Sequence, residues 1–330
     1  MPKPKVFVSR EIFPEALDSI RSVAEVDLWT DEMPPPRQVL LERCAGVDGV
    51  LCLLTDGIDV EFFERIGPQL KVVSQIAVGY NNIDVEEATK RGVSVGFTPD
   101  VLTDTTADFA FTLLMAAARK IVAGHEAAHN GSWRTWHPLH FLGQDIHRAT
   151  LGIVGMGRIG FEMARRSQGF DMNVLYFDIN ERKDLEARLP MTRVSMDTLL
   201  AESDFVSLHV DLNPSTHHMM NADAFKMMKS TAILINAARG PVVDHVALYE
   251  ALKTGEIGGA GLDVTEPEPM PVDHPLLTLD NCLVVPHIAS ASVATRRAMS
   301  LLAASNLIDG LEGRPMRACV NPEAQTPKAS

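Results

Sequence analysis

The sequence predicts an α/β protein of two domains, each built on a parallel sheet, and three observations lead to this prediction. The chain has 330 residues, which is longer than an ordinary single domain. Short apolar runs alternate with segments of helical periodicity, a pattern typical of parallel sheets with helices on their faces. Several apolar runs are hydrophobic at consecutive positions, as expected for strands that are buried on both sides.

The predicted strands form two series. The first series comprises residues 5–9, 49–54, 71–77 and 93–97. The second series comprises residues 150–155, 173–178, 205–210, 232–236, 259–264 and 282–286. Between the series the pattern predicts a long helix over 107–122, with Thr105 and Asp108 forming a capping box at its start. A final amphipathic helix is predicted over 290–311.

Composition and charge narrow the possible classes of function. The chain is 46% hydrophobic and 22% charged, which provides enough apolar surface for folded cores. Its formal net charge of −13 disfavours binding to nucleic acid or to an anionic membrane surface. No stretch has the length of a signal-peptide core or a membrane span, and the four cysteines form no C-x-x-C pair. We therefore expect a cytoplasmic protein with free thiols and with neither a membrane nor a nucleic-acid partner.

A glycine-rich turn gives the first specific indication of function. It follows a predicted strand, opens a predicted helix, and consists of Gly155, Met156, Gly157, Arg158, Ile159 and Gly160. Glycines at this spacing let the backbone approach a pyrophosphate, and the helix N-terminus offers amides and the positive end of a dipole. The pattern predicts a dinucleotide site, and the alternative is a tight turn without a ligand.

Asp178 bears on which dinucleotide binds. This residue ends the next predicted strand, where a carboxylate accepts a hydrogen bond from the ribose 2′-hydroxyl. The same carboxylate repels the 2′-phosphate of NADP, so NAD(H) is the favoured cofactor. Arg182 and Lys183 follow closely and leave NADP(H) open as an alternative.

Three polar residues each lie just after a predicted strand, at the edge where sites form in α/β proteins. They are Arg239, Glu268 and His287. An arginine clamps a carboxylate through two parallel hydrogen bonds, and a histidine exchanges a proton near neutral pH. Each residue alone has an ordinary interpretation, such as a surface ion pair. Together, and next to a nicotinamide site, they indicate hydride transfer to a 2-keto acid.

The long helix at 107–122 is interpreted as a crossover between domains. Residues 1–100 and 288–330 are expected to form a discontinuous substrate-binding domain, into which residues 101–287 are inserted as an NAD-binding Rossmann domain. Both domains are predicted to be Rossmann-like or flavodoxin-like, with an active-site cleft between them.

At this point the chain resembles the D-isomer-specific 2-hydroxyacid dehydrogenases, over nearly its whole length. The motifs that carry the resemblance are Ala77-Val78-Gly79, Leu151 to Gly160, Asn236 to Gly240, Gly261 to Val264 and Pro286-His287-Ile288. Within this family the resemblance is strongest to the glyoxylate/hydroxypyruvate reductases, through residues 98–107, 263–269, 273–277 and 299–304.

The resemblance implies a role for each matched residue, and no metal is expected in the site. Arg239 holds the substrate carboxylate and polarises the keto oxygen, His287 exchanges the proton, and Glu268 orients His287. The amides of Val78 and Gly79 bind the substrate's anionic end. The residues implied to contact the cofactor are Thr106, Gly155, Met156, Gly157, Arg158, Ile159, Gly160, Asp178, Ala237, Asp263 and Ala289. Ala289 stands where the family commonly has glycine, so contact with the cofactor is expected to differ slightly there.

The resemblance also implies a homodimer in which the NAD-binding domains pair. In relatives a tryptophan in the loop after the crossover helix reaches the neighbour's active site and contacts the substrate, and Trp136 is the candidate here. Packing of this side chain beneath its own loop is the alternative interpretation.

The predicted function is NAD(P)H-dependent reduction of a small 2-keto acid, glyoxylate or hydroxypyruvate, to glycolate or D-glycerate. Two alternatives stay open. One is reduction of another 2-keto acid such as 2-ketogluconate, and the other is a dinucleotide-sensing, corepressor-like binding protein that retains the same three residues.

Two histidine motifs offer competing interpretations. His125-Glu126-Ala127-Ala128-His129 matches H-E-x-x-H, which on a helix presents two imidazoles to zinc and would indicate a metallohydrolase. No third ligand follows at a recognisable spacing, so an exposed polar helix face is the favoured interpretation. His217 and His218 are expected to form a loop and the start of a helix rather than a metal site.

Overall fold

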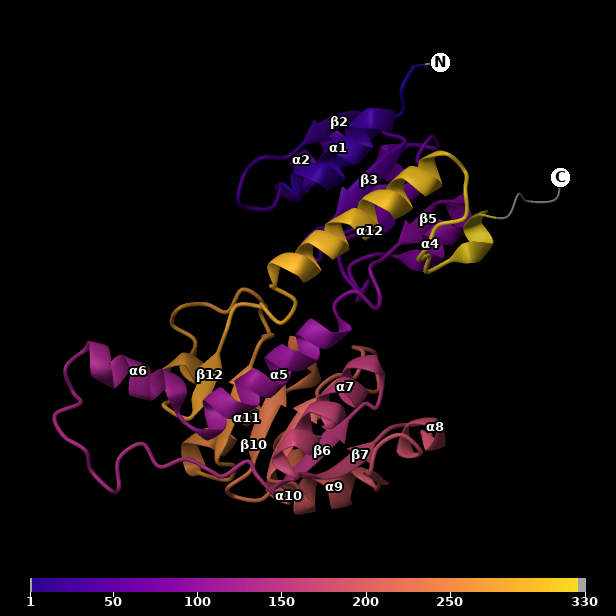
Figure 1. Cartoon of the computed structure of the whole chain (residues 1–330). Coiled ribbons are helices and arrows are strands. Elements are labelled where there is room, and N and C mark those ends of the chain that lie inside the picture. Colours follow the sequence, from indigo (N-terminus) through magenta and orange to yellow (C-terminus); the bar gives the residue numbers. More distant parts are fainter. Residues whose placement is uncertain (1, 326–330) are drawn as a thin grey trace. The chain divides into compact units, whose positions relative to one another are not determined.

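The computed structural model describes residues 2–325, which divide into two compact units. Unit 1 takes its residues from Met1–Leu102 and Ser292–Ser330, and unit 2 from Thr103–Ala291. Each unit contains a parallel sheet with helices between successive strands (Figure 1). The predicted α/β class, with two parallel sheets, is confirmed.

The sheet of unit 1 has the strand order β2-β1-β3-β4-β5, and all neighbours run parallel. The strands are β1 Lys5–Val8, β2 Glu25–Leu28, β3 Gly49–Cys52, β4 Val72–Gln75 and β5 Ser94–Gly96. Sequence reasoning missed β2. This strand lies at the sheet edge and is only partly buried, so its four residues include two acids and lack an apolar run.

The helices of unit 1 come from both ends of the chain. They are α1 Pro14–Val23, α2 Arg37–Cys44, α3 Val60–Ile66, α4 Val85–Arg91, α12 Val293–Leu311 and the short 3₁₀ helix η4 Pro322–Gln325. The helix α12 packs on β3, β4 and β5 (Figure 1). A Cβ at Gly310 would lie 2.6 Å from the side chain of Val72, so glycine is what lets α12 approach β4 closely.

The sheet of unit 2 has the order β12-β11-β10-β9-β6-β7-β8, again all parallel. Its strands are β6 Thr150–Val154, β7 Asn173–Phe177, β8 Thr192–Arg193, β9 Phe205–Leu208, β10 Ile233–Asn236, β11 Gly259–Leu262 and β12 Cys282–Val284. The strand order reverses at β6, which is where doubly wound sheets bind ligands. Sequence reasoning missed β8, because this two-residue edge strand is exposed and contains no apolar residue.

The helices of unit 2 are α5 Thr103–Ala118, α6 Ile121–His129, α7 Arg158–Ser167, α8 Lys183–Glu186, α9 Met196–Glu202, α10 Ala222–Met227 and α11 His245–Thr254, with 3₁₀ helices η1 Gln168–Phe170, η2 Gly240–Val242 and η3 Pro275–Thr278. Two apolar clusters cover the sheet, one with residues of α5 and α7 and the other with residues of α9, α10 and α11. Within residues 2–325, no helix combines the length and the apolarity that a membrane crossing requires.

The expected helix over 107–122 is wrong in its bounds. The chain turns at Asp100, which has a φ of +69°, and is already helical at Thr103, so Thr105 and Asp108 lie inside α5 rather than at its start. The helix then ends at Ala118, since Lys120 has a φ of +50° and α6 begins after it.

Candidate active site

The glycine-rich turn joins β6 to α7 at the point where the strand order reverses. Gly155 has a φ of +94°, and a Cβ there would lie 2.7 Å from the carbonyl oxygen of His209. A Cβ on Gly160 would lie 2.2 Å from the carbonyl oxygen of Gly155, so glycine lets α7 pack closely on the strand. A Cβ on Gly157 would meet no atom within 4 Å. This open side, at the first amides of α7, fits the pyrophosphate of a dinucleotide.

Asp178 directly follows β7 and lies beside this turn. Its Oδ2 accepts a hydrogen bond from the amide of Met156 at 2.8 Å, and its Oδ1 accepts one from the amide of Asn180 at 2.8 Å. An ionised carboxylate has about four acceptor positions, so acceptor capacity remains for a ribose hydroxyl. The structure thus brings together the turn and the acid that the sequence had related to one cofactor.

Arg182 lies close to the same turn, with its charge already paired. Its Nε and Nη2 donate to the two carboxylate oxygens of Asp184 at 3.0 and 2.9 Å, and its Nη1 donates to the carbonyl of Met156 at 2.7 Å. The hydrogen bonds to Asp184 raise the pKa of Arg182 above its ordinary value. Lys183, the second cation, is largely exposed and lies 3.3 Å from a carboxylate oxygen of Glu181.

His287 and Glu268 form a hydrogen-bonded pair. The distance from His287 Nδ1 to Glu268 Oε1 is 2.6 Å, and Glu268 Oε2 accepts from the amide of Thr265 at 3.2 Å. Burial opposes ionisation of Glu268, but the hydrogen bond and charge of His287 outweigh it and lower the pKa of Glu268 below its ordinary value. With Nδ1 directed to the carboxylate, Nε2 of His287 is the atom left to exchange a proton with a substrate.

Asp263 fixes the backbone that carries His287. Its two carboxylate oxygens accept from the amides of Ile288 and Ala289 at 2.7 and 3.0 Å, and its carbonyl accepts from the amide of His287 at 2.9 Å. These bonds hold His287 at a φ of +53°. Burial raises the pKa of Asp263, against the two amide bonds that lower it. Sequence reasoning missed this positioning role, because the partners lie in a different strand–turn segment.

Arg239 lies in a turn after β10 that the side chain of Asn236 ties together. Asn236 Nδ2 donates to the carbonyl of Arg239 at 2.9 Å, and its Oδ1 accepts from the amide of Ala238 at 3.0 Å. A Cβ on Gly240 would lie 1.9 Å from the carbonyl oxygen of Thr265. Glycine therefore lets this turn press against the segment that leads to Glu268.

The charge of Arg239 is largely buried beside two carboxylates. Burial lowers the pKa of Arg239, and the charges of Glu268 and Asp211 oppose that shift. Because a guanidinium stays protonated in proteins, the result is a fixed cation near the His287–Glu268 pair. A carboxylate substrate would find its complementary charge there.

Val78 and Gly79 belong to unit 1, where they follow β4 and are half-buried. The amide nitrogen of the Gln75 side chain donates to the carbonyl of Gly79, and Asn82 Nδ2 donates to Gln75 Oε1 at 2.7 Å, which holds the loop. At the same edge of the sheet, unit 1 has a cavity of about 420 Å³ whose lining includes Leu53, Ile76, Arg296 and Ser300.

The remaining predicted residues are placed as follows. Thr106 is buried in α5, Ala289 is buried after β12, and Ala237 is half-buried after β10. Arg158 and Ile159 are the first residues of α7. Trp136 is 80% exposed in the loop after α6.

The H-E-x-x-H motif lies on α6, where the rings of His125 and His129 are 4.0 Å apart. His129 Nδ1 is hydrogen-bonded to the carbonyl of His125 at 2.9 Å. In the part of the chain that the structure describes, no third His, Cys, Asp or Glu ligand joins this pair; the one such group of three lies elsewhere. Among the described residues the motif therefore lacks the third protein ligand that is typical of a catalytic zinc site.

Comparison with known proteins agrees with this geometry. Residues 111–289 match the family model described as D-isomer specific 2-hydroxyacid dehydrogenase, NAD binding domain. The glyoxylate reductase of Korarchaeum cryptofilum is 53% identical over 322 residues, which cover 97% of each chain.

Two solved structures show the same architecture. A protein from Thermus thermophilus has a TM-score of 0.91 and 43% identity, covering 96% of this chain and 99% of that one. The NADPH-dependent glyoxylate/hydroxypyruvate reductase of Sinorhizobium meliloti, in complex with NADP and malonate, has a TM-score of 0.86 and 31% identity over 99% and 100% of the two chains. The chain belongs to the D-isomer specific 2-hydroxyacid dehydrogenase family, and it is an NAD(P)-dependent oxidoreductase.

Proposed function

We propose that the protein reduces glyoxylate or hydroxypyruvate to the corresponding 2-hydroxy acid, with NADH as the preferred cofactor. The observation that carries the proposal is the grouping of Arg239 with the hydrogen-bonded pair of His287 and Glu268 in unit 2. The similarity to proteins named glyoxylate reductase supports this choice of substrate.

In this proposal the residues of the chain bind, orient and protonate the substrate. The guanidinium of Arg239 holds the carboxylate and polarises the keto oxygen. Val78 and Gly79, in unit 1, bind the anionic end through backbone amides. A bound reduced nicotinamide supplies the hydride that the keto carbon accepts. Nε2 of His287 donates the proton to the keto oxygen, and the carboxylate of Glu268 stabilises the ring orientation through Nδ1.

The preference for NADH rests on Asp178 and Arg182. The carboxylate of Asp178 lies at the glycine-rich turn and repels a 2′-phosphate, while Asp184 pairs the guanidinium that would otherwise attract one. The remaining contacts proposed for the cofactor are those of Thr106, Ala237, Asp263, Ala289 and the turn itself.

Steady-state kinetics on a panel of 2-keto acids, each with NADH and with NADPH, test this proposal. Glyoxylate or hydroxypyruvate should give the highest kcat/KM. A higher kcat/KM for a larger acid such as 2-ketogluconate would change the substrate assigned, and no turnover of any panel member would refute the reductase function.

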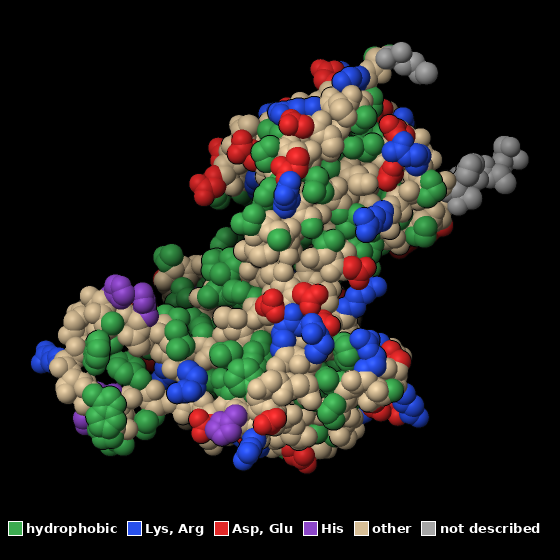
Figure 2. All heavy atoms as spheres, viewed as in Figure 1, with side chains coloured by type: hydrophobic (Ala, Val, Ile, Leu, Met, Phe, Trp, Pro, Cys, Tyr) green, Lys and Arg blue, Asp and Glu red, His purple; other side chains and the backbone are tan. Residues whose placement is uncertain are grey.

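We further propose a homodimer formed through unit 2, with Trp136 at the substrate site of the partner. The support is an exposed apolar loop after α6, in which Trp133 is 65%, Leu139 70% and Leu142 58% exposed (Figure 2). Single apolar residues are ordinary on a surface, but a cluster of this kind is typical of an interface. Light scattering should give about 72 kDa, twice the 36.1 kDa of one chain. A mass of one chain at micromolar concentration would refute the dimer.

Two further assignments complete the proposal. Unit 1 is the substrate-binding domain and unit 2 the NAD-binding domain, as the positions of Val78 and of the glycine-rich turn suggest. The protein is assigned to the cytoplasm because its four cysteines are free, as is usual in a reducing compartment.

A further inference from the structure

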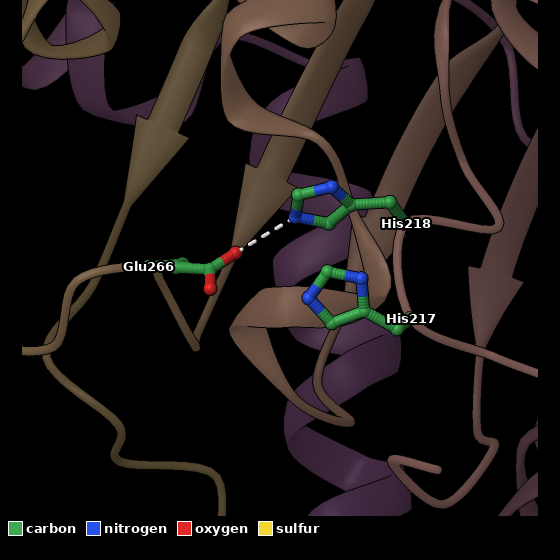
Figure 3. Close-up of side chains that lie close together, drawn as sticks. All are labelled: His217, His218 and Glu266. Atoms are coloured by element: carbon green, nitrogen blue, oxygen red, sulfur yellow. Dashed lines mark hydrogen bonds and ion pairs between the residues drawn. The ribbon is translucent and has the colours of Figure 1, made fainter. Parts of the chain in front are cut away.

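We propose that His217, His218 and Glu266 form a binding site for a divalent transition metal of the Zn²⁺ type, separate from the residues proposed to bind the substrate. The three side chains come from two segments, the turn after β9 and the segment after β11. Their potential ligand atoms all lie within 4.8 Å of one another. Figure 3 shows that the imidazole rings of His217 and His218 both point toward the carboxylate of Glu266.

The donor set is one that Zn²⁺ uses in proteins. Two imidazoles and one carboxylate leave a fourth position for water, as in open tetrahedral sites. Donor atoms around a tetrahedral Zn²⁺ are about 3.3 Å apart, given bonds of about 2.0–2.1 Å. His218 Nε2 and Glu266 Oε2 are already 3.0 Å apart, and the rings of His217 and His218 are stacked with centroids 4.0 Å apart. The separations between the potential ligand atoms are thus already close to those that coordination requires.

The histidine side of this cluster is held in place by the backbone. The amide of His218 donates to the carbonyl of Pro241 at 2.8 Å, and the amide of His217 donates to the carbonyl of Asn213 at 3.0 Å. The side chain of Asn213 in turn accepts from the amide of Ser215 at 2.9 Å. His218 has a φ of +49°, a conformation that this turn imposes.

The Glu266 side is held by a buried histidine. His245 is 5% exposed, and its Nδ1 lies 3.0 Å from the carbonyl oxygen and 3.2 Å from the amide of Glu266. These two backbone contacts make the buried His245 ring a support for the segment that carries Glu266. Since both segments are ordered before a metal arrives, little conformational entropy is lost on binding.

The position of the site has a consequence for activity, which rests on the proposed function. Glu266 and Glu268 share one short turn, in which Thr265 Oγ1 donates to the carbonyl of Pro267 at 2.8 Å and the amide of Thr265 donates to Glu268. A metal bound by Glu266 therefore acts on the turn that presents Glu268 to His287. We expect an occupied site to lower kcat.

The binding test uses the full-length protein after chelator treatment. Zn²⁺ is titrated by calorimetry, and Co²⁺ is followed by the visible bands of tetrahedral cobalt. The parent should bind about one equivalent per chain, and His218→Ala and Glu266→Gln should each weaken binding at least tenfold, a loss typical of altered metal sites. Glu266→Gln keeps the size of the side chain, and circular dichroism of each variant checks the fold.

The matched control is His125→Ala/His129→Ala on α6, which removes another close histidine pair with the same ring separation of 4.0 Å. This variant should keep the parent affinity and the cobalt spectrum. Binding that disappears in the control, that persists unchanged in His218→Ala, or that is absent from the parent would each overturn the site.

A second experiment measures the kcat of the same proteins for glyoxylate with and without saturating Zn²⁺. The parent and the α6 control should lose kcat, and His218→Ala should not. If the titration shows a filled site while kcat is unchanged, the link to Glu268 is refuted and the metal site stands. If no 2-keto acid is turned over, the proposed function fails, whereas the titration still decides on the metal site.

Discussion

Units 1 and 2 are both parallel α/β structures, yet they carry different chemistry at the carboxyl edges of their sheets. In unit 2 the strands β7, β10, β11 and β12 are each followed by a charged or titratable residue: Asp178, Arg239, Asp263 and His287. In unit 1, β3 and β4 are followed by Leu53 and Ile76, and the nearby carboxylate of Asp56 is buried and bonded to Ser9 Oγ and the amide of Leu53.

In the proposed function this difference corresponds to two tasks. The charged groups and the His287–Glu268 pair of unit 2 are proposed to interact with the transition state, so substitutions there should lower kcat. Unit 1 offers backbone groups and a cavity, so substitutions there should act mainly on KM. Each prediction below tests one side of this division.

The largest effect is expected at His287. His287→Ala removes the proposed proton donor and should lower kcat by ~10²–10⁴, with little change in the Kd for NADH. Glu268→Gln keeps an acceptor for Nδ1 and should cost less. Stopped-flow reduction of glyoxylate and fluorescence titration of NADH measure the two quantities. A parent rate in His287→Ala would mean that another group donates the proton.

The second effect is a dependence of stability on pH, and its sign differs between His209 in unit 2 and Asp56 in unit 1. Burial lowers the pKa of His209, which follows β9 in unit 2 and is bonded to Ser207, to about 4, while an unfolded histidine titrates near 6.5. The unfolded chain therefore binds more protons between these values, so acidification from pH 6.5 to 4 should lower the free energy of unfolding by up to roughly 3 kcal/mol. Burial raises the pKa of Asp56 in unit 1, and the stability linked to that group is instead lost as pH rises through its folded pKa.

Urea unfolding of His209→Gln across this pH range is the measurement. The variant should show a flatter pH dependence than the parent. The exposed His147→Gln variant serves as the control and should follow the parent curve. Equal curves for the His209 variant and the parent would mean that burial of this ring does not govern the response.

The third effect is expected at Arg239. Arg239→Ala removes a buried cation and should lower kcat/KM by roughly 10- to 150-fold, since hydrogen bonds to charged groups contribute about 1.5–3 kcal/mol. Both kcat and KM should change, because polarisation and anchoring are lost together. If only KM changed, Arg239 would act in substrate binding, as proposed for the groups of unit 1. The proposed division of kinetic roles between the two units would then be contradicted.

The fourth effect is a change of cofactor preference. Asp178→Ala should narrow the ratio of kcat/KM for NADH over NADPH by roughly 5- to 30-fold, equivalent to about 1–2 kcal/mol. Asp184→Ala releases Arg182 and should shift the ratio in the same direction by a smaller factor. Equal use of both cofactors by the parent would show that Arg182 captures the phosphate despite its carboxylate partner.

The smallest effect is expected in unit 1. Arg296→Ala removes a half-buried cation from the lining of the cavity and should raise KM by up to about fivefold, the range of a partly exposed charge pair, without changing kcat. Arg297→Ala is the matched control, because Arg297 lies on the same helix, is paired with Glu15 and does not line the cavity. A loss of kcat in Arg296→Ala would contradict the division between the units.

Sequence patterns predicted those parts of the molecule in which one local segment determines the structure. The central strands and the glycine-rich turn belong to this group, because consecutive apolar residues and glycine spacing are visible within a few positions. The edge strands β2 and β8 were missed, since partial exposure removes the apolar pattern. The break between α5 and α6 was missed as well, because Lys120 is an unusual residue for a positive φ.

Contacts between segments that lie far apart in the chain could not be predicted from the sequence either. The carboxylate of Asp263 bonds to amides after β12, and Glu266 meets His218 across the turn after β9. Both contacts depend on the order of strands in the sheet, which no local pattern contains. Their positions after predicted strands identified His287, Glu268 and Arg239 as candidates, and the family resemblance implied their roles. The hydrogen-bonded turns that position them became visible only in the structure.

The split composition of unit 1 has a consequence for biosynthesis. Unit 2 is one continuous segment, so it can fold as soon as it has left the ribosome. The sheet of unit 1 is synthesised before unit 2, but the helix that packs on β3, β4 and β5 is α12, which is made only after unit 2. Until then an apolar face of the nascent chain stays open, and we expect chaperones to engage the polypeptide there during translation.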